Sequence, residues 1–189
     1  MTALDLSKIT LRPFQPGDWA RIHEWASLEE PCRYQPWGPN TEAETEAFVA
    51  AAIASAAVRP RTRFAWVATH PESGVLGVGE VNVRHAVWRR GEISYAVHQD
   101  YWGQGVASEI GRILLQFGFE YLDLERIEAT CDPRNSASAA VLKRIGMTHE
   151  GILRRTVLIR TGWRDSKMHS IIRPEWTPIG GSPRWSLAS

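Results

Sequence analysis

The 189-residue chain lacks several features that would by themselves indicate a class of protein. It has only two cysteines, Cys32 and Cys131, so no disulfide framework is expected at this size. Its formal net charge of +1 gives no support to a nucleic-acid partner. No apolar run is long enough to span a membrane, and the N-terminus has no signal-peptide pattern. We therefore expect a cytoplasmic protein with no nucleic-acid and no membrane partner, either a monomer or a homodimer.

The six histidines show no spacing typical of metal ligands, so no metal site is expected. Tryptophan, by contrast, is abundant, with nine residues. Tryptophans in this number indicate aromatic walls in a pocket as well as core packing. The length suits one domain with a full hydrophobic core.

The order of predicted elements is that of a single mixed α/β domain. Strands are expected at 9–14, 64–69, 75–83, 91–98 and 126–131, with a closing antiparallel pair at 148–159 and 163–173. Helices are expected from a cap at Asp18, from a capping box at 41–44 to about residue 57, from the glycines at 103–105 to residue 121, and from Asn135 to Gly146. Residues 31–39 form a proline- and aromatic-rich loop.

The domain is predicted to cover residues 1–173, and residues 174–189 to form a C-terminal tail. Prolines, glycines and serines make a loosely held tail the first expectation. Trp176 and Trp185 keep a docked or dimer-contacting tail as the alternative.

The segment 101–108, Tyr-Trp-Gly-Gln-Gly-Val-Ala-Ser, is the most informative functional signal. It joins an expected strand to an expected helix, so free backbone N–H groups converge at the positive end of a helix dipole and suit a phosphate. A P-loop would need Gly-Lys-Ser/Thr, whereas Val106 and Ala107 follow Gly105 here. A Rossmann turn would need three glycines after a first strand and an acidic residue about 20 positions on.

The segment 102–107 resembles the pyrophosphate motif Arg/Gln-x-x-Gly-x-Gly/Ala of the GNAT superfamily of acyl-CoA-dependent N-acyltransferases. Trp102 replaces the usual Arg or Gln, as in the RimJ/RimL-type subgroup that acetylates ribosomal-protein N-termini. Residues 34–37 are similar to that subgroup's acceptor loop, and 135–147 to its Asn-x-x-Ser and Lys-x-x-Gly-Phe segment. The resemblance covers about residues 9–173.

The resemblance implies a GNAT fold, in which a central and mostly antiparallel sheet with splayed middle strands, here 91–98 and 126–131, is flanked by about four helices. It also implies acetyl-CoA as cosubstrate, with pantetheine in the gap and pyrophosphate on the N–H groups of the glycine turn, without help from a charged side chain. The implied cofactor-binding residues are Ala96, Val97, Trp102, Gly103, Gln104, Gly105, Val106, Ala107, Ser108, Asn135 and Ser138.

The implied chemistry is direct attack of a neutral amine on the acetyl thioester. Ser138 is the candidate catalytic group beside the sulfur, and a backbone N–H near Val97 the candidate for polarising the carbonyl. Glu80 is the candidate base, because a hairpin turn near residues 87–88 would place it opposite Tyr95. His98 is interpreted as a strand-end or cofactor-adjacent residue and Cys131 as a buried structural cysteine.

Tyr34 and Trp37 are the candidate walls of the acceptor site. Their aromatic rings suit a protein N-terminus or a small amine such as an antibiotic equally well. Glutamates at 29, 30, 42, 44 and 46 flank this loop and are interpreted as solvated faces. The leading prediction is an acetyl-CoA-dependent N-acetyltransferase, and the alternative is a non-catalytic module that senses acyl-CoA.

Overall fold

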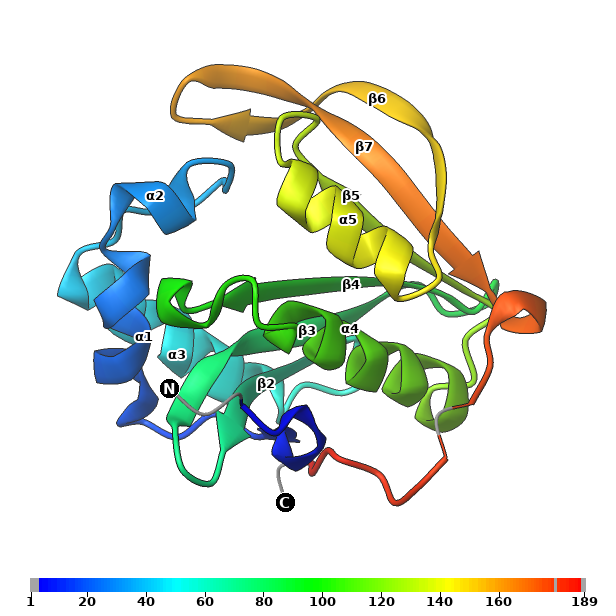
Figure 1. The fold of residues 1–189 in the computed structure, drawn as a ribbon, viewed down its shortest axis with the longest axis horizontal. Helices are drawn as coiled ribbons and strands as arrows, with labels where there is room; N and C mark the ends of the chain where they lie inside the picture. Colours follow the sequence, from blue (N-terminus) through cyan, green and yellow to red (C-terminus); the bar gives the residue numbers. More distant parts are fainter. Residues whose placement is uncertain (1–3, 179, 188–189) are drawn as a thin grey trace.

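The computed structural model of the protein describes residues 4–178 and 180–187, and it shows one seven-stranded sheet with helices on both faces (Figure 1). The strands are β1 Thr10–Arg12, β2 Arg63–His70, β3 Gly74–His85, β4 Arg90–Val97, β5 Arg126–Cys131, β6 Thr148–Ile159 and β7 Gly162–Ile172. Their order is β1-β2-β3-β4-β5-β7-β6, and every neighbouring pair is antiparallel except β4 and β5. The predicted mixed α/β fold with a mostly antiparallel sheet is confirmed.

The described residues form five α-helices: α1 Asp18–Ala26, α2 Glu29–Cys32, α3 Glu42–Ser55, α4 Val106–Gln116 and α5 Ser136–Arg144. Short 3-10 turns lie at Leu6–Lys8, Gln99–Tyr101 and Arg173–Glu175, and a π-turn at Phe117–Tyr121 extends α4. No described helix is long and apolar enough to cross a membrane.

Local capping chemistry sets the helix starts as predicted, with one exception. The capping box holds, since the Glu44 carboxylate accepts from Thr41 N at 2.7 Å and Thr41 Oγ1 accepts from Glu44 N. Asp18, however, is the first residue of α1 and not its cap, which is Gly17. The buried Asp18 carboxylate instead accepts from Gln15 N and from the Arg12 guanidinium, both at 2.7 Å. The expected loop at 31–39 also begins inside a short helix, α2.

Two apolar clusters lie on opposite faces of the sheet, because successive strand residues point to opposite sides. In β2, Trp66 packs with the α4 side chains, whereas Val67 packs with Trp25 of α1 and Val49 of α3. Both faces of β2 are therefore covered, and its residues 64–68 form a continuous buried apolar run.

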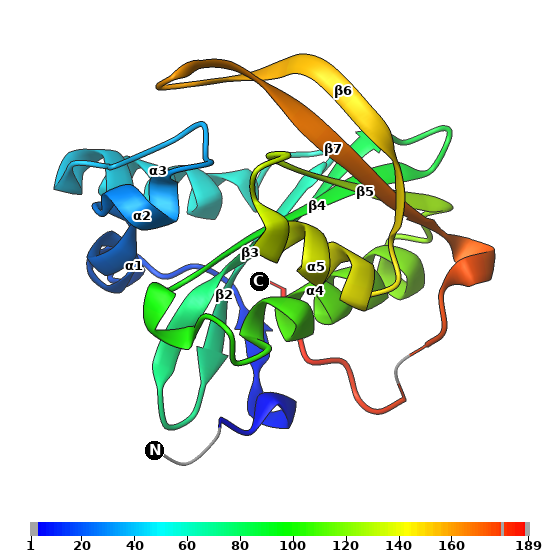
Figure 2. The same cartoon turned by 45° about the horizontal axis from the view of Figure 1, so that its top comes forward.

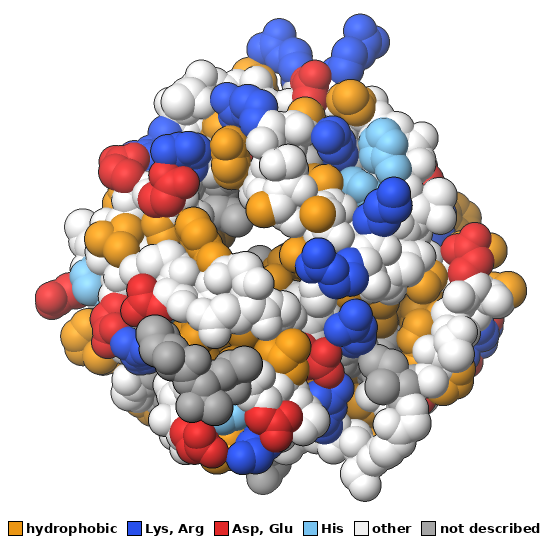
Figure 3. Space-filling model, in the orientation of Figure 1, with side chains coloured by type: hydrophobic (Ala, Val, Ile, Leu, Met, Phe, Trp, Pro, Cys, Tyr) orange, Lys and Arg blue, Asp and Glu red, His pale blue; other side chains and the backbone are white. Residues whose placement is uncertain are grey.

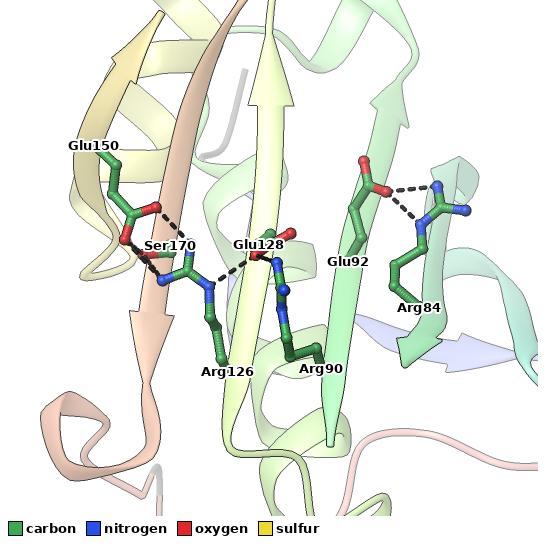
Figure 4. Close-up of polar contacts among 7 residues, drawn as sticks. All are labelled: Arg84, Arg90, Glu92, Arg126, Glu128, Glu150 and Ser170. Carbon is green, nitrogen blue, oxygen red and sulfur yellow. Dashed lines mark hydrogen bonds and ion pairs between the residues drawn. The ribbon is translucent and has the colours of Figure 1, made fainter. Parts of the chain in front are cut away.

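The two middle strands separate after a short parallel contact. Residues 90–92 of β4 pair with 126–128 of β5, and beyond these positions β4 has no partner on this side. At the last paired position, the Glu128 carboxylate accepts from Arg126 Nε at 2.7 Å and also bonds Arg90, and Arg126 reaches on to Glu150 of β6 (Figure 4). These contacts join the strands at the closed end of the splay, which confirms the predicted splayed middle strands.

The described part of the C-terminal tail, residues 174–178 and 180–187, is docked on the domain. Leu11 N donates to Arg184 O at 2.8 Å and Ser186 N donates to Leu11 O at 2.9 Å, so the tail runs beside β1 (Figure 1). The Trp185 ring packs edge-on against Phe117 with centroids 5.6 Å apart. The loosely held tail of our first expectation is therefore not what the structure shows.

Candidate active site

The splay between β4 and β5 opens into a cavity of about 450 Å³. Figure 3 shows the face of the molecule hollowed near its centre. Predicted residues from three separate segments line the cavity: Tyr34, Trp37, Ala96, Val97, Trp102, Gly103, Gly105, Val106, Ala107, Ser108, Asn135 and Ser138. Gln104 and Glu80 are the two predicted residues that do not line it. The structure thus brings together segments more than 100 positions apart.

The glycine turn forms an anion cradle at the start of α4. Gly103 and Gly105 have φ angles of +75° and +86°, in the left-handed region where a side chain would be strained. Within the described residues, none of the backbone N–H groups from 103 to 108 donates to another backbone group. Nothing lies within 4 Å of the place where a Cβ on Gly103 would stand, so the turn borders open space.

Trp102 positions this turn. Its indole Nε1 donates to Val97 O at 2.8 Å, which ties the turn to the end of β4. Gln104 faces away from the cavity and donates to Asp100 O at 2.8 Å. The indole at the first motif position is uncharged. It therefore fixes the position of the turn and does not neutralise phosphate charge.

Arg144 supplies the positive charge that the sequence interpretation did not foresee. It lines the cavity from the end of α5 and donates to Ser108 Oγ at 3.3 Å. No carboxylate in the described part of the chain forms an ion pair with it. A charged side chain therefore lies beside the cradle, although the sequence interpretation included none. Ser138, Val141 and Arg144 recur at every third position, which places them on one face of the helix. This spacing could have indicated that Arg144 lies on the same side as Ser138.

Alternation along β4 decides which backbone groups face the gap. His98 N donates to Leu76 O at 2.9 Å, so His98 and Ala96 belong to the positions that bond β3. Tyr95 and Val97 consequently turn their backbone groups toward the splay, where Val97 O accepts from Trp102. The Val97 N–H faces the gap as the carbonyl-polarising role requires, whereas the Ala96 backbone does not.

Ser138 lies in the first turn of α5, where Asn135 Oδ1 accepts from its backbone N–H at 2.9 Å. Beside it, the buried Tyr95 hydroxyl has no hydrogen-bond partner among the described residues. Burial raises the pKa of Tyr95 to about 12, against a smaller lowering by the nearby Ser138 hydroxyl, so Tyr95 keeps its proton. Burial also raises the pKa of the Cys131 thiol, which agrees with a structural cysteine.

Glu80 does not reach the cavity. It pairs with Ser94 and not with Tyr95, and its carboxylate accepts from Arg63 Nε at 3.2 Å and bonds Arg63 Nη2 as well. The base role predicted for Glu80 gains no support from this geometry. His98 is buried and its Nδ1 accepts from Asp100 N at 3.2 Å, so it caps the turn at 99–101 and does not line the cavity.

Aromatic rings form one wall of the cavity, beside the predicted acceptor loop. Tyr34 and Trp37 are joined there by Trp25 of α1, which the sequence interpretation missed. The carboxylates of α2 are paired: Glu29 accepts from Arg160 at 3.0 and 2.6 Å, and Glu30 pairs with Arg33. The pKa of Glu29 is lowered by the bonds from Arg160.

No group of three or more His, Cys, Asp or Glu side chains in residues 4–178 and 180–187 lies together as a metal ion would require. A parted sheet with an anion cradle on one side and aromatic walls on the other is the architecture of an N-acyltransferase that takes an acyl-CoA donor. The residues present fit coenzyme A, because the cradle offers N–H donors and Arg144 to an anion and β4 offers free backbone groups to an extended arm.

Residues 8–148 match the family described as "Acetyltransferase (GNAT) domain". The chain is 30% identical over 169 residues to the uncharacterized N-acetyltransferase YnaD of Bacillus subtilis (strain 168), covering 89% of this chain and 96% of that protein. It is 28% identical over 108 residues to the ribosomal protein uS5-alanine N-acetyltransferase of Escherichia coli (strain K12), covering 57% of this chain and 56% of that one. The chain belongs to the GNAT acetyltransferase family.

Solved structures agree with this assignment. A GNAT-family acetyltransferase from Bacillus anthracis matches with a TM-score of 0.78 and 27% identity, over 93% of this chain and 99% of that chain. The spermidine N-acetyltransferase from Vibrio cholerae in complex with CoA and spermine matches with a TM-score of 0.76 at 20% identity, over 89% and 98%. At 20% identity the second likeness is one of fold alone. The protein is an N-acetyltransferase-type acyltransferase.

Proposed function

We propose that the protein transfers an acetyl group from acetyl-CoA to a primary amine by direct attack in a ternary complex. One observation carries this proposal: a single cavity runs from the glycine cradle, past Ser138, to the rings of Tyr34 and Trp37. Donor and acceptor could thus meet in one place without a covalent enzyme intermediate.

The proposed donor site uses the cradle for the pyrophosphate. The N–H groups of residues 103–108 and the Arg144 guanidinium would hold its charge, and Ser108 would orient Arg144. The backbone of Tyr95 and Val97 would bind the pantetheine arm, since those groups face the splay. Asn135 would hold the first turn of α5, and with it Ser138, against this arm.

In the proposed reaction, the amine nitrogen attacks the thioester carbonyl carbon, the carbon–sulfur bond breaks, and the amine loses a proton while the thiolate gains one. The Val97 N–H would stabilise the carbonyl oxygen and the Ser138 hydroxyl the sulfur. Glu30, on the cavity wall, is paired with Arg33. We therefore assign the amine proton to water in the cavity.

The acceptor is a protein N-terminus or a small amine. The similarity to the ribosomal protein uS5-alanine N-acetyltransferase supports the first class, and the fold shared with a spermidine N-acetyltransferase admits the second. An acyl-CoA sensor is the other candidate function, because the cradle by itself would serve it.

A thiol-release assay with acetyl-CoA against amines and N-terminal peptides tests the proposal. We expect thiol release that depends on an amine and on its concentration. Tight acetyl-CoA binding with no amine-dependent release would instead establish the sensor function.

A further inference from the structure

A second and smaller cavity of about 80 Å³ continues from the first. The two share Tyr34, Gln35, Tyr95, Asn135 and Ser138 in their walls. The smaller cavity then extends past the end of β5 to Arg164 of β7. Because it is reached from Ser138 on the side of Tyr34, it lies where the acceptor would enter.

Arg164 lines this cavity, and its guanidinium is only partly satisfied by the described residues. Its Nη1 donates to Ser166 Oγ at 3.1 Å and to Asp165 O at 3.3 Å. Its Nε is buried and has no hydrogen-bond partner in the part of the chain that the structure describes. No described carboxylate forms an ion pair with Arg164. A buried donor of this kind is costly unless an acceptor oxygen meets it.

The charges around Arg164 leave an excess of positive charge. Asp132, the buried carboxylate at this end, already accepts two bonds from Arg134 at 2.9 and 2.7 Å. Those bonds are the first cause that lowers the pKa of Asp132, and the charge of Arg164 lowers it further. Lys167 and Arg164 also both act on the neighbouring Cys131 thiol. Arg134 and Arg164 thus both act on the Asp132 carboxylate, and Lys167 adds a further positive charge beside Cys131.

Among the described residues that line the two cavities, the carboxylates of Glu30 and Asp132 are already paired with arginines. Glu29 is paired with Arg160 and Glu30 with Arg33. A polyamine would therefore have to displace an arginine from a carboxylate, whereas an anion meets unpaired guanidinium directly.

We propose that Arg164 binds a carboxylate of the acceptor, so the acceptor is an amine that carries a carboxylate a few bonds away. This inference rests on the acetyltransferase function proposed above. The small volume of the cavity that holds both Ser138 and Arg164 sets the short separation of the two groups. The same chemistry occurs in a free amino acid and in a peptide whose first residue is acidic.

Two matched pairs of acceptors test the proposal: alanine against alaninamide, and a peptide beginning with Asp against the same peptide beginning with Asn. We expect kcat/KM to be about tenfold or more higher for the carboxylate member of at least one pair, because a charged donor favours an anionic acceptor. The pair that responds distinguishes a free amino acid from an acidic N-terminus. The amine of the amide member is less basic, so intrinsic reactivity by itself would favour the amide member over the carboxylate member.

The Arg164→Gln variant is expected to lose that preference, through a rise in acceptor KM of about tenfold or more, and to act on the amide member as the unsubstituted enzyme does. Arg164→Lys is expected to keep part of the preference for the carboxylate member. Arg154→Gln, which removes an exposed charge on β6, is the control and should leave kcat/KM unchanged for both members. The KM for acetyl-CoA and the melting temperature report whether each variant is folded.

Equal rates on both members of both pairs would overturn the proposal, as would an Arg164→Gln variant that slows both members equally. In either case amine-dependent thiol release would persist, so the proposed acetyltransferase function would stand. Absence of thiol release with every acceptor would instead refute that function and this inference together.

Discussion

Arg160, in the turn between β6 and β7, holds the carboxylate of Glu29 on α2 with two hydrogen bonds of 3.0 and 2.6 Å. The pair joins residues 131 positions apart and connects the β6–β7 hairpin to the helix that precedes the predicted acceptor loop. Figure 2 shows the hairpin reaching over the sheet toward α2. One exposed ion pair therefore links this hairpin to α2.

Arg160→Gln is expected to raise the acceptor KM severalfold with little change in the free energy of unfolding, since exposed ion pairs contribute little to stability. The pair's side chains are 50% and 77% exposed, so added salt should mimic the substitution. Acceptor titrations at low and high salt measure both effects. An acceptor KM that responds to neither salt nor substitution would show that the link does not shape the site.

Ala107→Glu is expected to abolish the rise in melting temperature that acetyl-CoA gives the unsubstituted protein, because a carboxylate would face the pyrophosphate in the cradle. A glutamate in the first turn of α4 suits the helix dipole, so folding should be retained. A substitution at Gly105 would be less informative, because its φ of +86° makes any side chain strained. Ala50→Glu, on the exposed side of α3, is the matched control, and its thermal shift should remain.

Ser138→Ala is expected to lower turnover about tenfold or more and to leave acetyl-CoA affinity nearly unchanged, because the hydroxyl acts only as charge develops on sulfur. The cap of α5 is unaffected, since Asn135 accepts from the backbone N–H of residue 138. The exposed Ser136→Ala change on the same helix serves as its control. Equal turnover in both variants would remove Ser138 from the mechanism.

Glu80→Gln is expected to leave turnover unchanged and to lower the free energy of unfolding by about 1 kcal/mol through loss of the Arg63 pair. Urea unfolding and a pH–rate series separate these effects. A rate loss that raising the pH does not relieve would return Glu80 to the role of general base.

Stability should fall in acid partly through Glu150. Bonds from Arg126 and Ser170 lower the pKa of Glu150 from 4.5 to about 2. A carboxylate with a lowered pKa in the folded state stabilises the fold above its unfolded pKa of about 4.3, and this stabilisation is lost as pH falls through that range toward 2. Glu150→Gln should therefore be less stable than the unsubstituted protein at pH 7 and lose less on acidification. Unfolding curves that run parallel from pH 7 to pH 2 would contradict this assignment.

Local chemistry explains which features could be predicted. The capping box at Thr41, the cap at Asn135 and the positive φ of the two glycines depend on neighbours within a few positions, so the residues themselves indicate them. The resemblance in three spaced segments then predicted the splay and the shared cavity.

The position of Glu80 depends on a shift in the pairing of β3 with β4, which the sequence does not show. The pairing of β3 with β4 shifts by one residue between Val83 and His85, so Glu80 lies opposite Ser94. A shift of one position moves a side chain to the other face of the sheet. Glu80 therefore points to Arg63 and away from the face that carries Tyr95.

By itself the sequence indicated the family through its resemblance in three spaced segments. It also determined the glycine turn and the order of elements, because these follow from local backbone chemistry and from patterns within a segment. Tertiary structure alone decided that Arg144 lines the cavity beside the cradle, that Arg164 lines the smaller cavity, and that the tail runs beside β1. These relationships join elements far apart in the chain. A charge or a hydrogen-bond donor is available to a ligand only if no neighbouring group already pairs with it, and packing decides which groups are paired.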